Sequence, residues 1–444
     1  MNTKQGVSRR RFLAGSAAVG VATIVPRHVL GAPGQPSANE KLNIAGIGTG
    51  GMGTGDVTRV PTENIVAICD VDASRAANAA KPFPKAKLYS DFRKLLDEMD
   101  GQIDAVMVAT PDHNHAVVTM AALKRGKHVF CQKPLTHSVH EALQVAKAAK
   151  EAGVATQMGN QGQATEEARL TCEYIWAGAI GQVREVHSWS NRQPDISPRG
   201  VPRPKETPPC PEHMNWDLWL GPSPVRPFHP CYHPFAWRGW WDFGTGVLGD
   251  IGCHNLSAAF KALKLGWPTS VEACSTHWNA PPEIKNETAP LASIITFRFP
   301  AEGDRPEIMI RWYDGGMMPP QPEGVAPGRN IFKGDGTLIV GDKGMLHGHR
   351  LLPESKMQEY GKPPQVLQRS PGHYQEWIDA CKGGPPAGSN FVDHAAPLAA
   401  VVLMGNVALR TQEKLYWDAE KLQFTNSDAA NALMNPPYRE GWTL

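Results

Sequence analysis

Several signals that assign function in other proteins are missing from this sequence of 444 residues. Its eight cysteines lie far apart and no CxxC pair occurs, and no spacing of histidines, cysteines and acids matches a known metal-ligand set. No internal repeat is visible, and the apolar run at 13–25 is too short and too rich in glycine and alanine for a stable membrane span. These absences leave a soluble globular protein long enough for two domains and give no support for a metal site.

The net charge of the chain is also small, and it is unevenly distributed. The formal net charge is +2, but residues 1–39 hold five basic residues (Lys4, Arg9, Arg10, Arg11 and Arg27) and no acid. Without that segment the net charge is −3. A mildly acidic chain offers no electrostatic reason to bind nucleic acid or an anionic membrane.

The basic segment resembles a twin-arginine export signal. Ser8-Arg9-Arg10-Arg11-Phe12-Leu13 precedes an apolar run and small residues near Gly31 and Ala32, as in a removable targeting peptide. We therefore expect residues 1–39 to be signal peptide and linker, the twin-arginine machinery to be a partner, and the periplasm to be the destination. An uncleaved membrane anchor and a disordered basic tail are the alternatives. Since such substrates fold before export in a reducing cytoplasm, we expect mostly buried free thiols.

From residue 41 the pattern alternates between strand and helix. Apolar runs at 41–48, 64–72, 103–111, 127–134 and 154–160 have the character of buried parallel strands, and helical patterns separate them, among them 113–126 and 139–153. This alternation predicts a doubly wound Rossmann domain over 40–162.

The remaining residues, 163–444, have a different character. Residues 194–235 are irregular and rich in proline, and alternating stretches such as "SVEACSTHW", "ASIITFRF" and "EIMIRWY" predict antiparallel strands. "GDGTLIVGDKGMLHG" predicts a hairpin, and 393–414 a late helix. We expect a second, substrate-binding α+β domain here.

A glycine-rich turn follows the first predicted strand. Gly48-Thr49-Gly50-Gly51-Met52-Gly53 matches GxGxxG, which lets backbone N–H groups approach a pyrophosphate at a helix N-terminus. Asp70 ends the second strand, where a carboxylate accepts hydrogen bonds from ribose hydroxyls and repels a 2′-phosphate. The pattern favours NAD over NADP, with Asp72 as a second candidate for the ribose. The alternative is a structural turn with Asp70 as a helix cap.

Two further groups are candidates for chemistry. Lys133, in "CQKP", ends the fourth strand, where its ammonium can stabilise a developing alkoxide. Asp250 and His254 are spaced i, i+4, which on a helix puts a general base beside a carboxylate that orients it. Taken alone, a solvated lysine and a packed histidine are the more ordinary interpretations. A metal site built from Asp112, His113, His115 or the histidines of "HGH" at 347–349 has little support.

Together these motifs resemble the Gfo/Idh/MocA oxidoreductases. The resemblance rests on GxGxxG at 48–53, "VATPDHNHA" at 108–116, the lysine–proline strand end at 133–134 and the Gly-rich DxxxH at 244–254, in that order. It implies an α/β protein: an N-terminal Rossmann dinucleotide-binding domain plus a C-terminal α/β domain with a large open, mainly antiparallel sheet. It also implies a homo-oligomer.

The resemblance assigns residues to a site as well. Lys133, Asp250 and His254 would surround a sugar or polyol hydroxyl. Gln132 stands where the family usually has Glu, which removes a negative charge and should lower the proton affinity of Lys133. The implied cofactor contacts are Gly48, Gly50, Gly51, Met52, Gly53, Asp70, Thr110, Pro111, Asn114, His115, Gln132, Lys133 and Gln161.

An aromatic loop at 215–244 leads into the DxxxH segment. Its tryptophans and neighbouring rings are suited to stacking on carbohydrate faces, and equally to forming a small core that anchors the loop. We take Trp237, Arg238 and Trp240 as candidate substrate contacts; Arg238 and His233 suit hydroxyls or an acidic group.

Export restricts the chemistry, because free NAD is scarce outside the cytoplasm. An exported folded protein carries its cofactor with it and must return the hydride within the same site. We therefore expect an NAD-dependent oxidoreductase acting on a sugar, polyol or glycoside hydroxyl with internally recycled NAD. The alternatives are a redox-neutral NAD-dependent glycosidase (oxidation, elimination, reduction) and a non-catalytic sensor.

Overall fold

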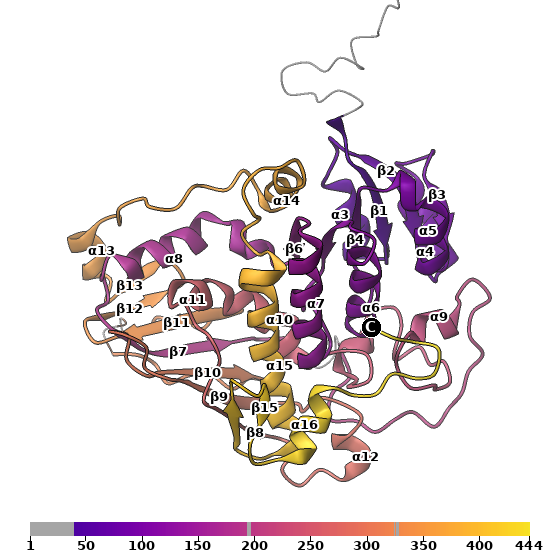
Figure 1. Ribbon diagram of the computed structural model, residues 1–444. Helices are drawn as coiled ribbons and strands as arrows, with labels where there is room; N and C mark the ends of the chain where they lie inside the picture. Colours follow the sequence, from indigo (N-terminus) through magenta and orange to yellow (C-terminus); the bar gives the residue numbers. More distant parts are fainter. Residues whose placement is uncertain (1–39, 193–196, 324, 326–327) are drawn as a thin grey trace, which may run out of the picture. The chain divides into compact units, whose positions relative to one another are not determined.

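The computed structural model describes residues 40–192, 197–323, 325 and 328–444 of the chain (Figure 1). The twin-arginine sequence and the rest of the predicted targeting peptide, residues 1–39, lie outside the described residues. The compact unit from Leu42 to Leu444 is the part considered below.

The first sheet has six parallel strands in the order β3-β2-β1-β4-β5-β6 (Figure 1). This is the Rossmann order, which reverses between β1 and β4 and opens a crevice at their carboxyl ends. The strands are β1 (Asn43–Ile47), β2 (Asn64–Cys69), β3 (Lys87–Tyr89), β4 (Ala105–Val108), β5 (His128–Cys131) and β6 (Thr156–Met158). The five strands expected from the sequence are present. Sequence patterning missed β3 because none of its three residues is buried.

Helices connect these strands, as the alternation predicted. They are α3 (Met52–Thr58), α4 (Ala73–Ala80), α5 (Phe92–Met99), α6 (Asp112–Leu123) and α7 (Val139–Ala152). Local caps define the helix ends: Ser138 and Glu141 form a capping box at the start of α7, and Gly153, with φ 63°, ends it.

The second sheet has nine strands in the order β13-β12-β11-β7-β10-β9-β8-β14-β15. The pairs are antiparallel except β7 with β10, and the predicted hairpin is β11 with β12. The strands are β7 (Val183–Trp189), β8 (Ser270–Ser275), β9 (Ser293–Phe299), β10 (Ile308–Asp314), β11 (Gly336–Gly341), β12 (Gly344–His347), β13 (Arg350–Leu352), β14 (Leu415–Asp418) and β15 (Gln423–Phe424). The predicted fold class, a Rossmann domain with a second α/β domain around a mainly antiparallel sheet, is confirmed.

The helices of the second half are α8 (Glu166–Trp176), α9 (Trp216–Leu220), α10 (Gly246–Asn255), α11 (Ser257–Ala262), α12 (Pro282–Lys285), α13 (Ser355–Tyr360), α14 (His373–Cys381), α15 (Ala396–Thr411) and α16 (Asp428–Met434). Short 3₁₀ turns lie at Asp100–Gln102, Gln161–Ala164 and Ala236–Gly239, and a π turn, Phe391–Ala395, leads into α15. The segment Phe391–Thr411 is long and apolar enough to cross a membrane, but 83% of its apolar window is buried inside the protein, as in a core helix.

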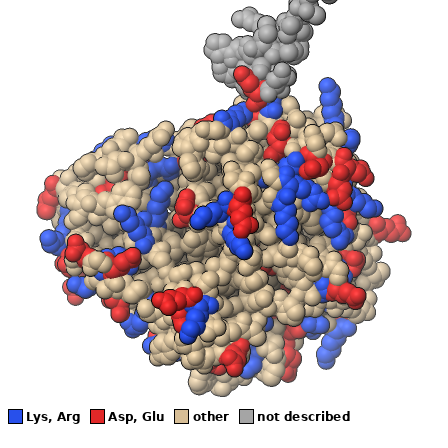
Figure 2. Space-filling model, in the orientation of Figure 1, with Lys and Arg blue, Asp and Glu red and all other residues tan. Residues whose placement is uncertain are grey.

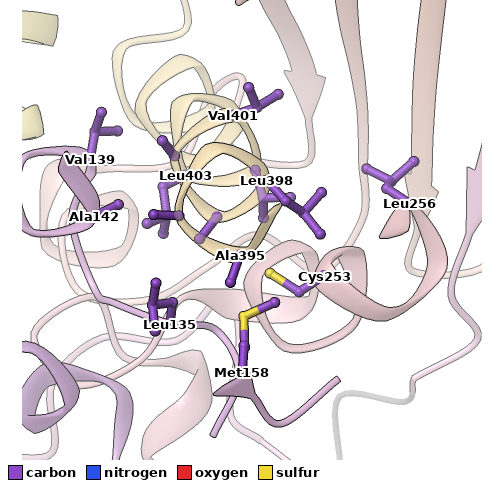
Figure 3. Close-up of a cluster of buried hydrophobic side chains, with 14 of the residues drawn as sticks. Leu135, Val139, Ala142, Met158, Cys253, Leu256, Ala395, Leu398, Val401 and Leu403 are labelled. Carbon is purple, nitrogen blue, oxygen red and sulfur yellow. The ribbon is translucent and has the colours of Figure 1, made fainter. Parts of the chain in front are cut away.

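One continuous core joins the two sheets. Helix α15 packs against α7 of the first half and against α10, β8 and β9 of the second. In Figure 3 Leu135 and Met158 lie close to Cys253 and Ala395, so side chains from both halves meet at this helix. The catalytic candidates on α10 are therefore fixed relative to the first sheet.

Helix α14 belongs by sequence to the second half but packs on the first sheet. Its Trp377 and Ile378 join a buried cluster with Ile44, Ile68 and Phe130. The chain thus returns to the Rossmann sheet after completing most of the second one, which sequence patterning did not anticipate.

The surface charges are mixed, and the cysteines are free as expected, but only half of them are buried. Basic and acidic side chains are interspersed on the face drawn in Figure 2. All eight cysteines are free thiols, and four of them (Cys69, Cys131, Cys172 and Cys253) are buried.

We predict that Trp377→Ala destabilises the protein by about 3–5 kcal/mol, because it removes a fully buried ring from the contact between α14 and the first sheet. Trp278, which is 76% exposed, provides the matched control. Trp278→Ala should change the free energy of unfolding by less than about 0.5 kcal/mol. Urea unfolding followed by circular dichroism measures both; equal effects would show that α14 does not contribute to the core.

Candidate active site

A cavity of about 570 Å³ lies at the carboxyl ends of the first-sheet strands. Residues after β1, β2, β4 and β5 border one part of it, and α10 with the aromatic loop borders the other. Of the predicted site residues, it brings together Gly48, Gly50, Gly51, Met52, Asp70, Thr110, Pro111, Asn114, His115, Gln132, Lys133, Trp237, Arg238, Asp250 and His254. Gly53, Gln161 and Trp240 do not border it.

The glycine turn is shaped by its close contacts. Gly48 and Gly51 adopt φ values of 77° and 58°, which glycine alone tolerates easily. A Cβ on Gly53 would lie 1.9 Å from the backbone oxygen of Gly48, so this glycine lets α3 approach the turn although it does not border the cavity. A Cβ on Gly51 would meet nothing within 4 Å, so that side of the turn is open.

Asp70 braces this turn. Its carboxylate accepts hydrogen bonds from the backbone N–H of Thr49 at 2.8 Å and of Asp72 at 3.0 Å. Burial raises the pKa of Asp70 against the effect of these bonds. Asp72, the second candidate for the ribose, instead caps α4 through Ser74 and Arg75.

Arg75 is a cavity residue that the sequence did not indicate. A Cβ on Gly50 would lie 2.3 Å from its Nη1, so the guanidinium rests against the turn. Its Nε is 3.4 Å from a carboxylate oxygen of Asp72.

The start of α6 provides the next wall of the cavity. Asn114 donates to the carbonyl of Trp219 at 3.0 Å, which ties the aromatic loop to this helix. His115 has its Nδ1 2.7 Å from the Pro134 carbonyl and its Nε2 2.8 Å from the Thr110 carbonyl. Because both neighbours only accept, the ring is best satisfied when both nitrogens carry protons. Burial opposes this charge, yet Cys131 and the two carbonyls raise the pKa of His115 overall.

Asp112, the first residue of α6, is the carboxyl group that sequence reasoning set aside. It borders the cavity and accepts a hydrogen bond of 2.7 Å from Thr245 Oγ1, next to the start of α10. Burial raises its pKa to about 7. Its position after Pro111 at a strand end was the only sequence signal for it.

The structure explains Gln132, the departure from the family pattern. Its amide nitrogen donates to Asp56 Oδ2 at 2.9 Å, and Tyr374 of α14 donates to Asp56 Oδ1 at 2.6 Å. Asp56 is fully buried, and a carboxylate at position 132 would face it and repel it unless the pair took up a proton. Gln161 lies behind this network, where it donates to Tyr374 Oη at 3.3 Å.

The catalytic candidates meet across the two halves. Lys133 Nζ donates to the backbone oxygen of Asp250 at 2.9 Å and forms an ion pair with its carboxylate. Arg238 Nε is 3.4 Å from the same carboxylate. Although burial raises it, Lys133 and Arg238 hold the pKa of Asp250 below its usual range.

A hydrogen bond between Asp250 and His254 is not among the contacts of the described residues, although, against the effect of burial, the Asp250 charge raises the pKa of His254 as expected. The contacts of Asp250 go to Lys133 and Arg238 and not to the ring of His254, one turn later on α10. Burial and then the Lys133 ammonium lower the pKa of His254 to about 3, so the ring is neutral near pH 7. A neutral imidazole that borders the cavity has a lone pair for a proton, but this low pKa makes it a weak base while the positive charge around it is not offset.

The aromatic loop is both a wall and a core. Trp237 and Arg238 border the cavity, and the Arg238 guanidinium lies 3.9 Å from the ring centre of Phe235 and 4.3 Å from that of Trp237. Trp240, by contrast, is 1% exposed and donates to the Cys231 carbonyl at 3.2 Å. It belongs to the small aromatic core, so the structure does not place it as a substrate contact.

The described residues contain no group of three His, Cys, Asp or Glu side chains arranged to hold a metal ion.

Two family models match the chain. The model described as "Oxidoreductase family, NAD-binding Rossmann fold" matches residues 42–160, and "Oxidoreductase family, C-terminal alpha/beta domain" matches 203–272 and 392–444. Together they cover more than half of the sequence.

Curated relatives align over part of the chain. A levoglucosan dehydrogenase of Pseudarthrobacter phenanthrenivorans is 30% identical over 253 residues, which is 54% of this chain and 55% of that protein. An inositol 2-dehydrogenase of Rubrobacter xylanophilus is 32% identical over 165 residues, which is 36% of this chain and 46% of that protein. The chain thus spans about half the length of the curated relatives it matches.

Solved structures share the fold over most of the chain. A levoglucosan dehydrogenase in complex with NADH and levoglucosan has a TM-score of 0.55 at 20% identity and covers 84% of this chain and 98% of that one. The WlbA dehydrogenase from Bordetella pertussis, in complex with NADH and UDP-GlcNAcA, has a TM-score of 0.57 at 18% identity and covers 85% and 99%.

We predict that Gln132→Glu destabilises the protein in a pH-dependent way. Two facing carboxylates share a proton, so the pKa of the pair in the folded state lies above the unfolded value of about 4.3, and stability is lost as the pH rises above that value. The variant should resemble the wild type near about pH 5 and lose about 1–3 kcal/mol by about pH 8 in urea unfolding.

Asp56→Asn in the same chain supplies the test of cause. The double variant exchanges the two groups and should recover most of the stability lost at high pH. A loss that does not depend on pH, or that Asp56→Asn fails to reverse, would contradict the assigned contact.

Proposed function

The chain belongs to the Gfo/Idh/MocA oxidoreductase family, and from this membership we propose that it oxidises a CH–OH group of a carbohydrate or polyol with NAD. The observation that carries the proposal is a single cavity in which the glycine turn and Asp70 accompany Lys133, Asp250 and His254. A dinucleotide site and a proton-transfer site that share one cavity suit hydride chemistry on a hydroxyl-bearing carbon.

The residues around the turn fit a dinucleotide. The turn is open at Gly51, and the buried hydroxyl of Thr110, at the cavity wall, lacks a hydrogen-bond partner among the described residues. Gly48, Gly50 and Gly51 would hold the pyrophosphate. Asp70 is the carboxylate that favours NAD over NADP. Arg75 would suit a 2′-phosphate, but it is already paired with Asp72.

The residues of the chain divide the chemistry among them. The nicotinamide, when bound, supplies the acceptor for the hydride. His254 takes the hydroxyl proton, because its ring is neutral and borders the cavity. Lys133 donates to the reacting oxygen, and Asp250 positions the Lys133 ammonium through two contacts. Asp112 adds a negative charge near Arg238 and Lys133 above about pH 7, which favours their charged forms.

We extend the proposal to location. The twin-arginine sequence, which lies outside the described residues, supports export of the folded protein to the periplasm with NAD already bound. The signal segment is then either cleaved or kept as a membrane anchor. Retention of bound NAD is supported by the start of the aromatic loop, which is tied to the chain next to Asp70. The Asn215 backbone donates to Val71 and the Ala73 backbone donates to His213, both at 2.8 Å. A cofactor that stays bound must be reoxidised in place by a second substrate. We also propose that the protein forms a homo-oligomer.

A redox-neutral glycosidase is the second candidate. Oxidation followed by β-elimination and reduction needs a further acid–base group, and Asp112, with a pKa of about 7 at the cavity wall, has the required character.

We predict that the undialysed protein purified from the periplasm contains NAD that a sugar or polyol reduces, seen as a rise in reduced-nicotinamide absorbance. His254→Ala should keep the dinucleotide and lower the rate of reduction by about 10²-fold or more, because the proton acceptor is lost. His140→Ala, on α7 away from the cavity, should behave like the wild type.

The same preparation separates the candidates. Cleavage of a chromogenic glycoside with no net change in nicotinamide absorbance would favour the glycosidase. Tight dinucleotide binding with no reduction by any sugar would mean a sensor, and a His254→Ala variant of normal rate would remove this histidine from the chemistry.

A further inference from the structure

Among the described residues, the part of the cavity next to α10 carries more positive than negative charge. Lys133, Arg192 and Arg238 border it, and the facing acids are Asp250 and Asp112. Asp250 is shared between Lys133 and Arg238, while Arg192 forms no ion pair with a described residue. Since burial raises the pKa of Asp112 to about 7, this carboxyl group is only a partial counter-charge at neutral pH.

The Arg238 guanidinium is held in one orientation by its neighbours. Its guanidinium lies against the rings of Phe235 and Trp237, and its Nη1 donates to the Phe235 carbonyl at 3.0 Å. Stacking and this hydrogen bond fix the plane of the group, so little rotamer entropy is lost when it binds a ligand. A guanidinium fixed in this way is matched to a planar carboxylate.

A smaller cavity of about 20 Å³ adjoins this region and shares Arg192, Arg238 and Asp250 with the larger one. Arg199 also borders it; this side chain is buried, and its Nη1 has no hydrogen-bond partner among the described residues. Asp314 offsets the charge of Arg199 from a distance. The positive charges at this wall that face the larger cavity are therefore those of Arg192 and Arg238. Asp195 lies outside the described residues.

Building on the proposed function, we propose that the substrate is a sugar acid whose carboxylate binds between Arg192 and Arg238 while its reacting hydroxyl faces Lys133 and His254. The small adjoining cavity accommodates a carboxylate oxygen and not a phosphate group. Arg192, three residues after the end of β7, is thereby a specificity-determining residue that the sequence did not indicate.

An anionic substrate also assists the chemistry. Lys133 and Arg192 both disfavour a proton on His254. A carboxylate seated beside Arg192 offsets part of this positive charge, so the ring becomes a better proton acceptor when the substrate is bound. The acid should therefore improve the rate of reduction as well as the affinity.

The experiment compares neutral sugars with their acids on the holoenzyme: glucose with glucuronate, galactose with galacturonate, and glucose 6-phosphate as the phosphate arm. Calorimetry measures binding, and the absorbance of the bound dinucleotide measures reduction. We expect an acid to bind about tenfold or more tightly than its neutral partner, the size of one charge-assisted hydrogen-bond pair, with a preference that weakens as salt rises.

Arg192→Gln should reduce the acid-to-neutral affinity ratio to about one, because it weakens the acid far more than the neutral sugar when the charge contact is lost. Arg192→Lys should restore part of the ratio. Arg203→Gln removes an exposed arginine that pairs with Glu287 outside the cavity and should leave the ratio unchanged. A purely structural role of Arg192 would instead weaken both sugars together.

The outcomes separate this inference from the proposed function. If neutral sugars bind as well as their acids and reduce the bound dinucleotide, the acid assignment is wrong and the oxidoreductase proposal stands. Preference for glucose 6-phosphate would overturn the carboxylate assignment. If no sugar of either kind binds or reduces the dinucleotide, both proposals fail.

Discussion

The ion pair between Lys133 and Asp250 is the interaction on which the site depends. It joins the end of β5 in the first sheet to α10 against the second sheet, and it brings Arg238 and His254 to the same cavity. A buried pair of this kind contributes little net stability, because desolvating two charges costs about as much as their attraction returns. The ion pair acts by positioning: the core around α15 holds the two halves together, and the pair holds the Lys133 ammonium beside α10.

Features that sequence patterning predicts well are local ones. The parallel strands, the connecting helices and the glycine turn follow from apolar periodicity and from caps within a few residues. The features that sequence patterning did not predict are either exposed or depend on residues far apart in the sequence. Strand β3 has no buried residue, and the contact of Asp56 with Gln132 and Tyr374 joins residues 76 and 318 positions from Asp56. The ion pair of Asp250 with Lys133 spans 117 positions, so the i, i+4 spacing suggested His254 instead.

The same limit explains the aromatic loop. Composition could not separate rings that stack on a sugar from rings that form a small core, and the structure contains both. Trp237 borders the cavity, whereas Trp240 is buried in the aromatic cluster and does not border it. The distinction depends on which ring the fold turns inward, which no local pattern encodes. The unusual Gln132 likewise had no local explanation until Asp56 was found facing it.

The proposed chemistry depends on a dinucleotide that travels with the folded chain. The direct measurement is the nicotinamide content of protein purified from the periplasm, after its release by denaturation. The wild type should yield close to one NAD per chain. Gly55→Ala, whose Cβ would meet only the mobile end of Arg59 at 3.0 Å, should match it, whereas Gly53→Ala, whose Cβ would lie 1.9 Å from the Gly48 oxygen, should be empty although folded. An empty wild-type protein that takes up no added dinucleotide would contradict the account.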